Sequence, residues 1–297
     1  TKTSTWHEDV KFFEIYTKKK KLVGKFYLDL YARKNKRGGA WMDEAISKYK
    51  FMNEEENPVA YLTCNFTPPS NGNAYLTHDE VITLFHEFGH GLHHLLTEVT
   101  EYSISGIKGV EWDAVELPSQ FMENYCWEWS VIKDMSYNNK TKTYMPKKIF
   151  NKLLESKNFQ SGMQTLRQVE FALFDIKLHS EYSSKNRNFM KILNSARAQV
   201  SVMETPSWNK FPHSFSHIFS GGYSSAYYSY KWAEVLSADA YSLFEEIGIL
   251  SKTAGNRFKK EILSKGGSRS AMESFIAFRG RKPKINALLA HHGLTNQ

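Results

Sequence analysis

A histidine-rich segment, TLFHEFGHGLHHLLT at residues 83–97, carries the clearest chemical signal in the sequence. Residues four apart on a helix share a face, so His86 and His90 can both reach one zinc ion. Glu87 lies beside that face, where it can accept a proton from a zinc-polarised water without being a ligand. The pentapeptide HEFGH therefore matches the H-E-x-x-H pattern of zinc hydrolases.

The other two histidines of the segment offer a rival pair, because His90 and His94 are also four residues apart. Gly91 stands where that pair would need a glutamate, so the pair lacks a base. His93 lies about 10 Å along the helix axis from His86, which is too far for one ion to be shared. We therefore expect His93 and His94 to serve in packing or in hydrogen bonds that support the ligands.

Two glycines, Gly89 and Gly91, interrupt the same helical pattern. Each costs roughly 0.5–1 kcal/mol relative to alanine in the middle of a helix. A helix that accepts two of them is expected to be approached closely by another backbone or by a ligand.

A third zinc ligand must come from outside this helix, because a catalytic zinc usually keeps three protein ligands and one open position. The segment GVEWDAVELPSQFMEN, residues 109–124, follows the helix and offers four acidic candidates: Glu111, Asp113, Glu116 and Glu123. Glu116 stands at the start of a second predicted helix that could pack against the first. It also forms a capping-box pattern with Asp113, so spacing alone leaves both roles open.

A second polar segment, HIFSGGYSSAYYSYKW at residues 217–232, could supply donors for a tetrahedral oxyanion. Such donors are typically worth a few kcal/mol each in amide hydrolysis. The segment contains a histidine and four tyrosines: His217, Tyr223, Tyr227, Tyr228 and Tyr230. Any one tyrosine taken alone is more typical of packing with a hydrated hydroxyl. The pair Gly221–Gly222 predicts a loop that can move when substrate binds.

The elements that must position these residues are mainly helices, with a small β-sheet near the N-terminal end. Strand patterns occur at Lys25–Ala32, Val59–Phe66 and, more briefly, Asn73–Thr77. Apolar residues recur at helical spacing from Thr77 to Leu96, and further helix-like segments follow at Met122–Ile132, Thr165–Tyr182, Asn188–Val202 and Ala226–Ile247.

Composition bounds the class of protein. The 297 residues are 41% hydrophobic and 24% charged, which is typical of a globular chain with a real core. The net charge of +8 comes from dispersed lysines, so we expect solvated surface lysines rather than a nucleic-acid or membrane partner. Cys64 and Cys126 form no metal or disulfide pattern, and no signal-peptide region is visible. These features predict a cytoplasmic protein.

The longest motifs resemble the thimet oligopeptidase family of zinc metallopeptidases, and within it the bacterial oligopeptidase A branch. The strings that carry this resemblance are THDEVITLFHEFGHGLHHLL, WDAVELPSQFMENYCWE, FYLDLYARKNKRGGAWMD, PVAYLTCNF and FPHSFSHIFSGGYSSAYYSYKWAEVLSADAY. The resemblance covers essentially the whole chain. The resemblance implies a zincin-type metallopeptidase catalytic domain over residues 1–297, corresponding to the C-terminal part of a longer protein.

The resemblance also implies roles for individual residues around the metal. His86, His90 and Glu116 would bind one Zn²⁺, and Glu87 would act as general base and acid. Asp113 would be the partner that orients a zinc-bound histidine.

Further roles follow for the tyrosine-rich segment. His217, Tyr223 and Tyr230 would act in catalysis, with the two tyrosines as the best candidates to donate to the oxyanion. Tyr227 and the Gly221–Gly222 pair would contact the substrate, whereas Tyr228 has no such counterpart. An edge strand beside the active-site helix would pair with the extended peptide, and either Val59–Phe66 or Asn73–Thr77 could provide it.

The function that these expectations describe is zinc-dependent endopeptidase cleavage of short peptides. A dipeptidyl carboxypeptidase of the same superfamily is an alternative, which would need a cation to read the terminal carboxylate of the substrate. A fragment that is inactive without its partner is another, because family members are longer and carry an N-terminal helical half that has no counterpart here.

Overall fold

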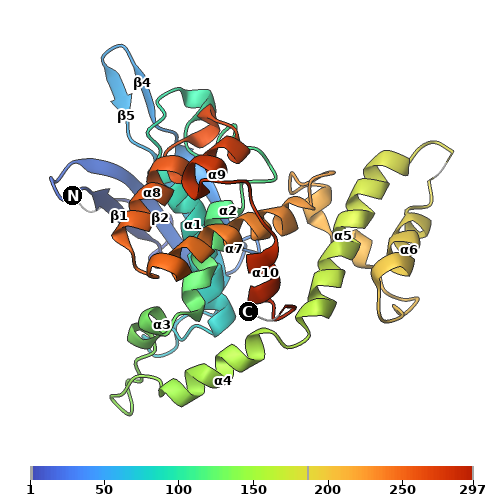
Figure 1. Ribbon diagram of the computed structural model, residues 1–297. Helices are drawn as coiled ribbons and strands as arrows, with labels where there is room; N and C mark the ends of the chain where they lie inside the picture. Colours follow the sequence, from blue (N-terminus) through green and yellow to red (C-terminus); the bar gives the residue numbers. More distant parts are fainter. Residues whose placement is uncertain (1–2, 186, 296–297) are drawn as a thin grey trace.

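The computed structural model describes residues 3–185 and 187–295 and places the sheet at the N-terminal end of the chain (Figure 1). The strands are β1 (Lys11–Tyr16), β2 (Leu22–Tyr31), β3 (Trp41–Ile46), β4 (Tyr49–Phe51), β5 (Glu54–Glu56) and β6 (Val59–Phe66). One sheet has the order β1-β2-β6-β3, and β4 and β5 form a hairpin that projects from the body. β2 and β6 are parallel, whereas the other neighbours are antiparallel.

β6 is an inner strand of the sheet, and its nearly continuous apolar run is buried on both faces. It pairs with β2 on one side and with β3 on the other. The expectation that this strand is a sheet edge facing substrate is therefore wrong. The alternative, Asn73–Thr77, is wrong as well, since the segment contributes only an isolated bridge between Ser70 and Asn73. The outer strand nearest to the long helix that follows is β3.

Helices make up most of the remaining chain, as the sequence predicts for a mainly helical protein. They are α1 (His78–Leu95), α2 (Leu117–Glu123), α3 (Trp129–Met135), α4 (Lys147–Lys157), α5 (Ser161–Glu181), α6 (Phe189–Val200), α7 (Ser229–Ile247), α8 (Lys252–Phe258), α9 (Ala271–Arg279) and α10 (Asn286–His291). In the described ranges, every helix is too short or too polar to cross a bilayer.

The start of α1 is fixed by a capping box. The Thr77 hydroxyl accepts a hydrogen bond from the Glu80 backbone N–H at 3.2 Å, and the Glu80 carboxylate accepts one from the Thr77 N–H at 2.8 Å. From there α1 runs across the sheet, where Phe88 and Leu95 pack against Leu62 and its neighbours. The histidine-rich turns are thus held between the sheet and the helices that follow.

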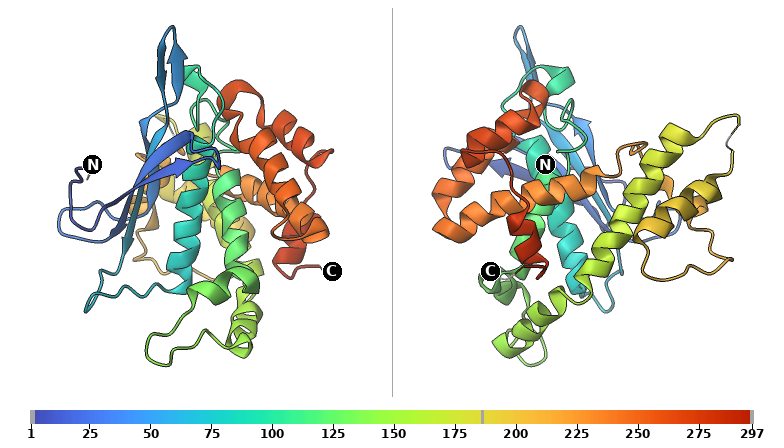
Figure 2. Two further views of the ribbon diagram at one scale, coloured as in Figure 1. Left: turned by 90° about the vertical axis from the view of Figure 1, so that its left-hand side faces the viewer. Right: turned by 45° about the vertical axis from the view of Figure 1, so that its right-hand side comes forward.

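The two glycines of α1 mark two close approaches. One of them is to α2, which lies beside α1 (Figure 2). A Cβ on Gly89 would lie 2.5 Å from the carbonyl oxygen of Pro118 and 2.6 Å from the Cα of Ser119. A Cβ on Gly91 would lie 3.0 Å from the Cδ2 atom of Leu62 on β6. Gly89 therefore allows the α2 backbone to touch α1, and Gly91 allows α1 to settle onto the sheet.

Gly89→Ala is expected to destabilise the fold by about 1–3 kcal/mol, because the methyl group meets backbone atoms that cannot rotate away. The change should also weaken zinc binding, since it displaces the helix that follows Glu116. Gly91→Ala is the matched control, because its methyl group meets only a side chain, and its effect should stay within about 1 kcal/mol. Chemical denaturation and zinc titration measure both effects. Equal behaviour of the two variants would contradict the close α1–α2 contact.

The C-terminal helices complete the body of the molecule, whereas α5 and α6 stand away from it (Figure 1). Phe121 on α2 stacks on Phe258 on α8 with ring centroids 4.1 Å apart, inside the largest apolar cluster. A second cluster joins α5 and α6 to Phe215 and Ile218, which belong to the segment leading into α7. That segment is therefore attached to the α5–α6 pair as well as to the body.

One predicted helix, Met122–Ile132, is interrupted in the structure. The Asn124 side chain donates to the carbonyl oxygens of Gln120 and Phe121, both at 3.1 Å, and so satisfies groups at the end of α2. Glu128 is extended, with φ −101° and ψ 121°, so the chain turns before α3 begins. Apolar spacing alone could not reveal this break, because the residues on both sides of it keep the helical pattern.

Candidate active site

The three metal-ligand side chains expected from the sequence lie together, two on successive turns of α1 and one just before α2. Glu116 Oε2 is 3.2 Å from the Nε2 atom of His86 and 3.1 Å from that of His90. Ligands placed tetrahedrally at about 2.0–2.1 Å from one zinc ion would be roughly 3.3 Å apart. Within the part of the chain that the structure describes, these residues form the cluster whose ligand atoms all lie within 4.8 Å of one another. The donor set and its spacing fit zinc.

Glu116 is held in place by two hydroxyl groups. Ser119 donates to Glu116 Oε2 at 2.8 Å, and the Tyr223 hydroxyl donates to Oε1. Burial would raise the pKa of Glu116, but His90 and His86 lower it well below its usual range. The carboxylate is therefore ionised, as a metal ligand must be.

Glu87 follows the first histidine of the cluster and is only 5% exposed. Its Oε2 atom is buried and has no hydrogen-bond partner among the described residues. Burial is also the main reason why the pKa of Glu87 is raised above its usual range. A buried, unpartnered carboxylate beside candidate metal ligands is typical of a group that exchanges a proton with a bound molecule rather than one that stabilises the fold.

The residue that orients His86 is Glu123, at the end of α2. Its Oε1 atom is 2.6 Å from His86 Nδ1, which leaves Nε2 facing Glu116. Asp113 forms no hydrogen bond or ion pair with either histidine among the described residues, so the structure does not bring it to the place that the resemblance implied. Glu123 was within reach of sequence reasoning, because it lies two helical turns after Glu116 and so shares its face.

Glu123→Ala is expected to lower zinc affinity by about 10–100-fold, because loss of an orienting partner frees the ligand histidine. Asp113→Ala is the matched control and should bind zinc as the parent protein does. Zinc titration against a competing chelator measures both. Loss of affinity in the Asp113 variant alone would contradict the geometry and restore the role that the resemblance implied.

The segment that leads into the first turn of α7 brings its histidine and three of its tyrosines together. Tyr223 and Tyr230 stack with ring centroids 4.7 Å apart, and Tyr227 lies 5.2 Å from Tyr230. His217 lies within 5.9–6.4 Å of all three rings. The bond from Tyr223 to Glu116 joins this cluster to the metal ligands. Burial raises the pKa of both Tyr223 and Tyr230, so their hydroxyls stay protonated and can donate.

The glycine pair shapes the loop that carries these rings. A Cβ on Gly221 would lie 2.8 Å from the Cα of His217, and Gly222 has φ +86°, a conformation that favours glycine. Trp112, which sequence reasoning did not single out, packs against both Gly222 and the edge of the Tyr223 ring, 4.8 Å between centroids. Its position four residues before Glu116 was the available signal. Tyr228 is 41% exposed and belongs to none of these ring pairs.

His93 and His94, near the end of α1, lie away from the ligand cluster and are buried. His94 Nε2 is 2.9 Å from the carbonyl oxygen of Ile46 at the end of β3. Burial, with smaller effects from neighbouring histidines, lowers the pKa of His93 to about 3, and burial also lowers that of His94. Both side chains are therefore neutral packing groups, one of which ties α1 to the sheet.

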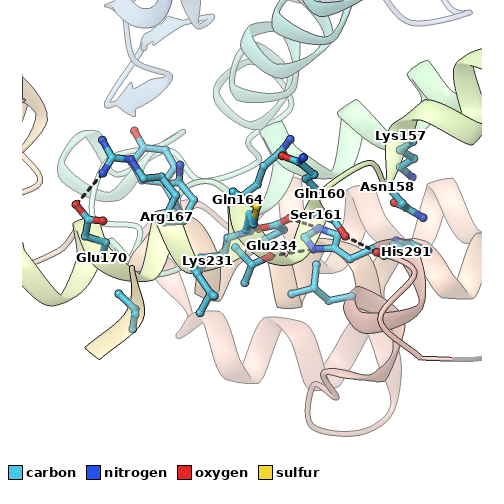
Figure 3. A pocket seen from close by; sticks show the side chains of 18 of the residues that line it. Lys157, Asn158, Gln160, Ser161, Gln164, Arg167, Glu170, Lys231, Glu234 and His291 are labelled. Carbon is cyan, nitrogen blue, oxygen red and sulfur yellow. Dashed lines mark hydrogen bonds and ion pairs between the residues drawn. The ribbon is translucent and has the colours of Figure 1, made fainter. Parts of the chain in front are cut away.

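A cleft of about 990 Å³ opens beside the tyrosine cluster (Figure 3). Glu123, Tyr227 and Tyr230 are among the residues that line it, so the cleft borders the tyrosine cluster and the partner of His86. Charged side chains of α5 and α7 follow its wall, including the pair Arg167–Glu170 at 2.7 Å. Its volume is in the range that holds a small organic ligand or a few peptide residues.

Known proteins resemble this chain over nearly its whole length. The model of peptidase family M3 matches residues 1–294. Oligopeptidase A of Salmonella typhimurium is 52% identical over 297 residues, which is 99% of this chain and 44% of that protein. Oligopeptidase A of Escherichia coli is 53% identical over 292 residues, or 97% of this chain and 43% of that protein. The chain thus spans less than half the length of these curated relatives.

A solved structure with a similar fold is Trypanosoma cruzi metallocarboxypeptidase 1, with a TM-score of 0.62 and 13% sequence identity. The superposition covers 91% of this chain and 55% of that one, and at this identity it speaks for the fold alone. It agrees with the zincin-type architecture expected from the sequence. With the family match over nearly the whole length and relatives at more than half identity, the chain belongs to peptidase family M3, which confirms the family resemblance that its motifs predict.

Proposed function

We propose that the protein is a zinc-dependent endopeptidase of the oligopeptidase A type that hydrolyses short peptides. The observation that carries this proposal is the cluster of His86, His90 and Glu116 with the unpartnered Glu87 carboxylate beside it. The relatives named oligopeptidase A support the choice of activity. The cytoplasmic location stays a prediction from the sequence.

When bound by these three residues, zinc supplies Lewis acidity that lowers the pKa of a water molecule and polarises the peptide carbonyl. Glu87 accepts the proton of the attacking water and then returns it to the leaving amine. The burial of Glu87 supports this role, because a carboxylate with a raised pKa holds the proton between the two transfers.

The tyrosine cluster acts on the other side of the reacting carbonyl. Tyr230, with Tyr223, donates hydrogen bonds to the oxygen that becomes negatively charged. In the absence of substrate the Tyr223 hydroxyl donates to Glu116. His217, Tyr227 and the Gly221–Gly222 loop contact the peptide backbone.

The oligopeptidase A relatives are longer than this chain, and the proposal gives their additional length a role. The chain corresponds to 43–44% of the two oligopeptidase A relatives. We propose that an N-terminal helical half is the partner of this domain and closes the peptide channel, which restricts substrates to short peptides.

Digestion of one unstructured decapeptide, followed by mass spectrometry of the products, tests the proposal. The full-length protein is this chain together with the proposed N-terminal half. We expect it to cleave the decapeptide internally when it is loaded with zinc. Serial release of C-terminal dipeptides would instead indicate the dipeptidyl carboxypeptidase alternative. Cleavage by the full-length protein but not by residues 1–297 would indicate a domain that needs its partner, whereas no cleavage by either would contradict the proposal.

A further inference from the structure

The loop that leads into α7 carries Tyr223 and Tyr227 and is anchored by one carboxylate of α5. Asp175 is fully buried in the middle of that helix. Its Oδ1 atom accepts a hydrogen bond from the Ser225 backbone N–H, and Oδ2 accepts one from the Tyr227 N–H, each at 2.9 Å. Both oxygens therefore point at the loop, and the residues that they hold lie just after Tyr223 and before Tyr230.

The carboxylate is itself held in place from the next turn of α5. His179 Nδ1 is 2.9 Å from Asp175 Oδ1 and 2.9 Å from the Asp175 carbonyl oxygen. With three partners, the side chain has a single arrangement that satisfies all of them. The loop is thereby tied to one position along α5.

A second residue of α5 holds the same tyrosine by its hydroxyl. Gln168 lies two turns before Asp175, on the same face, and its Oε1 atom accepts a hydrogen bond from the Tyr227 hydroxyl at 3.0 Å. Tyr227 is thus fixed at both ends, at its backbone N–H by Asp175 and at its phenol by Gln168.

The backbone of this loop is strained, and an anchor on α5 holds it in that conformation. Ser225 has φ 58°, which is left-handed and strained for a residue other than glycine, and Gly222 has φ +86°. The zinc-ligand cluster lies on α1 and before α2, whereas the loop packs through Phe215 and Ile218 on the α5–α6 pair (Figure 1). Tyr223 is carried by the loop and stacks on Tyr230 of α7, so the placement of this pair depends in part on how the loop is attached to α5.

We propose that Asp175 is a positioning residue for peptide hydrolysis, which acts by holding the Ser225 and Tyr227 amides so that Tyr223 and Tyr230 face the reacting carbonyl. This inference rests on the proposed function of the same site. Asp175 contacts neither metal ligands nor substrate, so it acts through the loop alone. Gln168 contributes to the same placement through the Tyr227 hydroxyl.

The test begins with Asp175→Asn in the full-length protein, because this change keeps the shape but sets an NH₂ group against a backbone N–H. We expect kcat/KM for the decapeptide to fall by about 100-fold, the size of effect that a displacement near 1 Å produces. Zinc stoichiometry should stay at the parent value, because the ligands lie elsewhere. Amide exchange of residues 217–228 should become about tenfold faster, the equivalent of roughly one lost hydrogen bond.

A second pair of variants keeps the test decisive if Asp175→Asn does not fold. Gln168→Glu retains an oxygen that can accept the Tyr227 hydroxyl, whereas Gln168→Leu does not. We expect the glutamate variant to keep most of the activity and the leucine variant to lose about tenfold in kcat/KM, the equivalent of one hydrogen bond. Ser180→Ala, on the exposed side of α5, controls for general effects on that helix and should behave as the parent.

The outcomes separate this inference from the proposed function. If the parent protein cleaves the decapeptide and Asp175→Asn stays within twofold of it with unchanged amide exchange, the positioning role is wrong. Loss of zinc in Asp175→Asn would also overturn it, because the effect would then be on the metal site. If the parent cleaves no peptide, the proposed function fails, while the exchange measurement still decides whether Asp175 holds the loop.

Discussion

Glu87→Gln is expected to abolish peptide cleavage while zinc stays bound. The change keeps the size of the side chain and removes only its ability to accept a proton, so the group that activates water and protonates the leaving amine is lost. General acid–base groups contribute about 10²–10⁴-fold, and here one residue serves both transfers, so the loss should lie near the upper end. Steady-state kinetics with the decapeptide and elemental analysis of the same sample measure the two quantities.

Asp79→Asn is the matched control for this variant. Asp79 is an exposed acidic residue on the first turn of the same helix, and its substitution should leave both activity and zinc content unchanged. Peptide cleavage by Glu87→Gln at a rate within tenfold of the parent would remove Glu87 from the mechanism.

Glu116→Ala is expected to have the second largest effect, this time on the metal. Without the carboxylate between His86 and His90, only two ligands remain, which is fewer than catalytic zinc sites use. Zinc should be lost on dialysis, and cleavage should fall by at least about 100-fold. Glu111→Ala, an exposed acidic residue five positions earlier, serves as the control.

An outcome in which Glu116→Ala retains one zinc per chain after dialysis would contradict the ligand assignment. In that case one of the neighbouring acids would have to complete the site, and Glu123 is the carboxylate nearest to His86. A double variant, Glu116→Ala with Glu123→Ala, would then identify it.

The histidine pair could be predicted from the sequence because the requirement is local. Two residues four apart on one helix share a face whatever the rest of the chain does, and a glutamate stands between only one of the possible pairs. Glu116 could not be singled out in this way, because its place depends on how α2 crosses α1. That crossing depends in turn on Gly89, whose missing Cβ leaves room for the backbone at Pro118 and Ser119.

The residue that orients His86 also could not be predicted from local spacing. The resemblance implied Asp113, whereas the carboxylate at His86 Nδ1 belongs to Glu123. Distances across two packed helices, not positions along one, decide between them. Sequence reasoning also missed Trp112 and Asp175, because no local pattern marks them. Asp175 is more than 50 residues away from its partner Tyr227 in the sequence, and Trp112 is more than 100 residues away from its partner Tyr223.

The sheet shows which features of a strand can be predicted from its sequence pattern and which cannot. The aromatic and β-branched run at Val59–Phe66 predicted a strand, and the structure makes it β6, a buried inner strand of the sheet. The same run does not indicate which strands lie on either side, because those pairings are made by β2 and β3. The edge strand beside α1 could therefore be identified only from the order of the strands in the sheet, which shows that it is β3.

Zinc-edge anomalous diffraction from crystals of the zinc-loaded full-length protein would test the central claim most directly. The account predicts one anomalous peak per chain, bonded to His86 Nε2, His90 Nε2 and Glu116, with Glu87 in position to reach a fourth ligand. A protein that cleaves the decapeptide but has its zinc peak elsewhere, or has no peak at all, would contradict it.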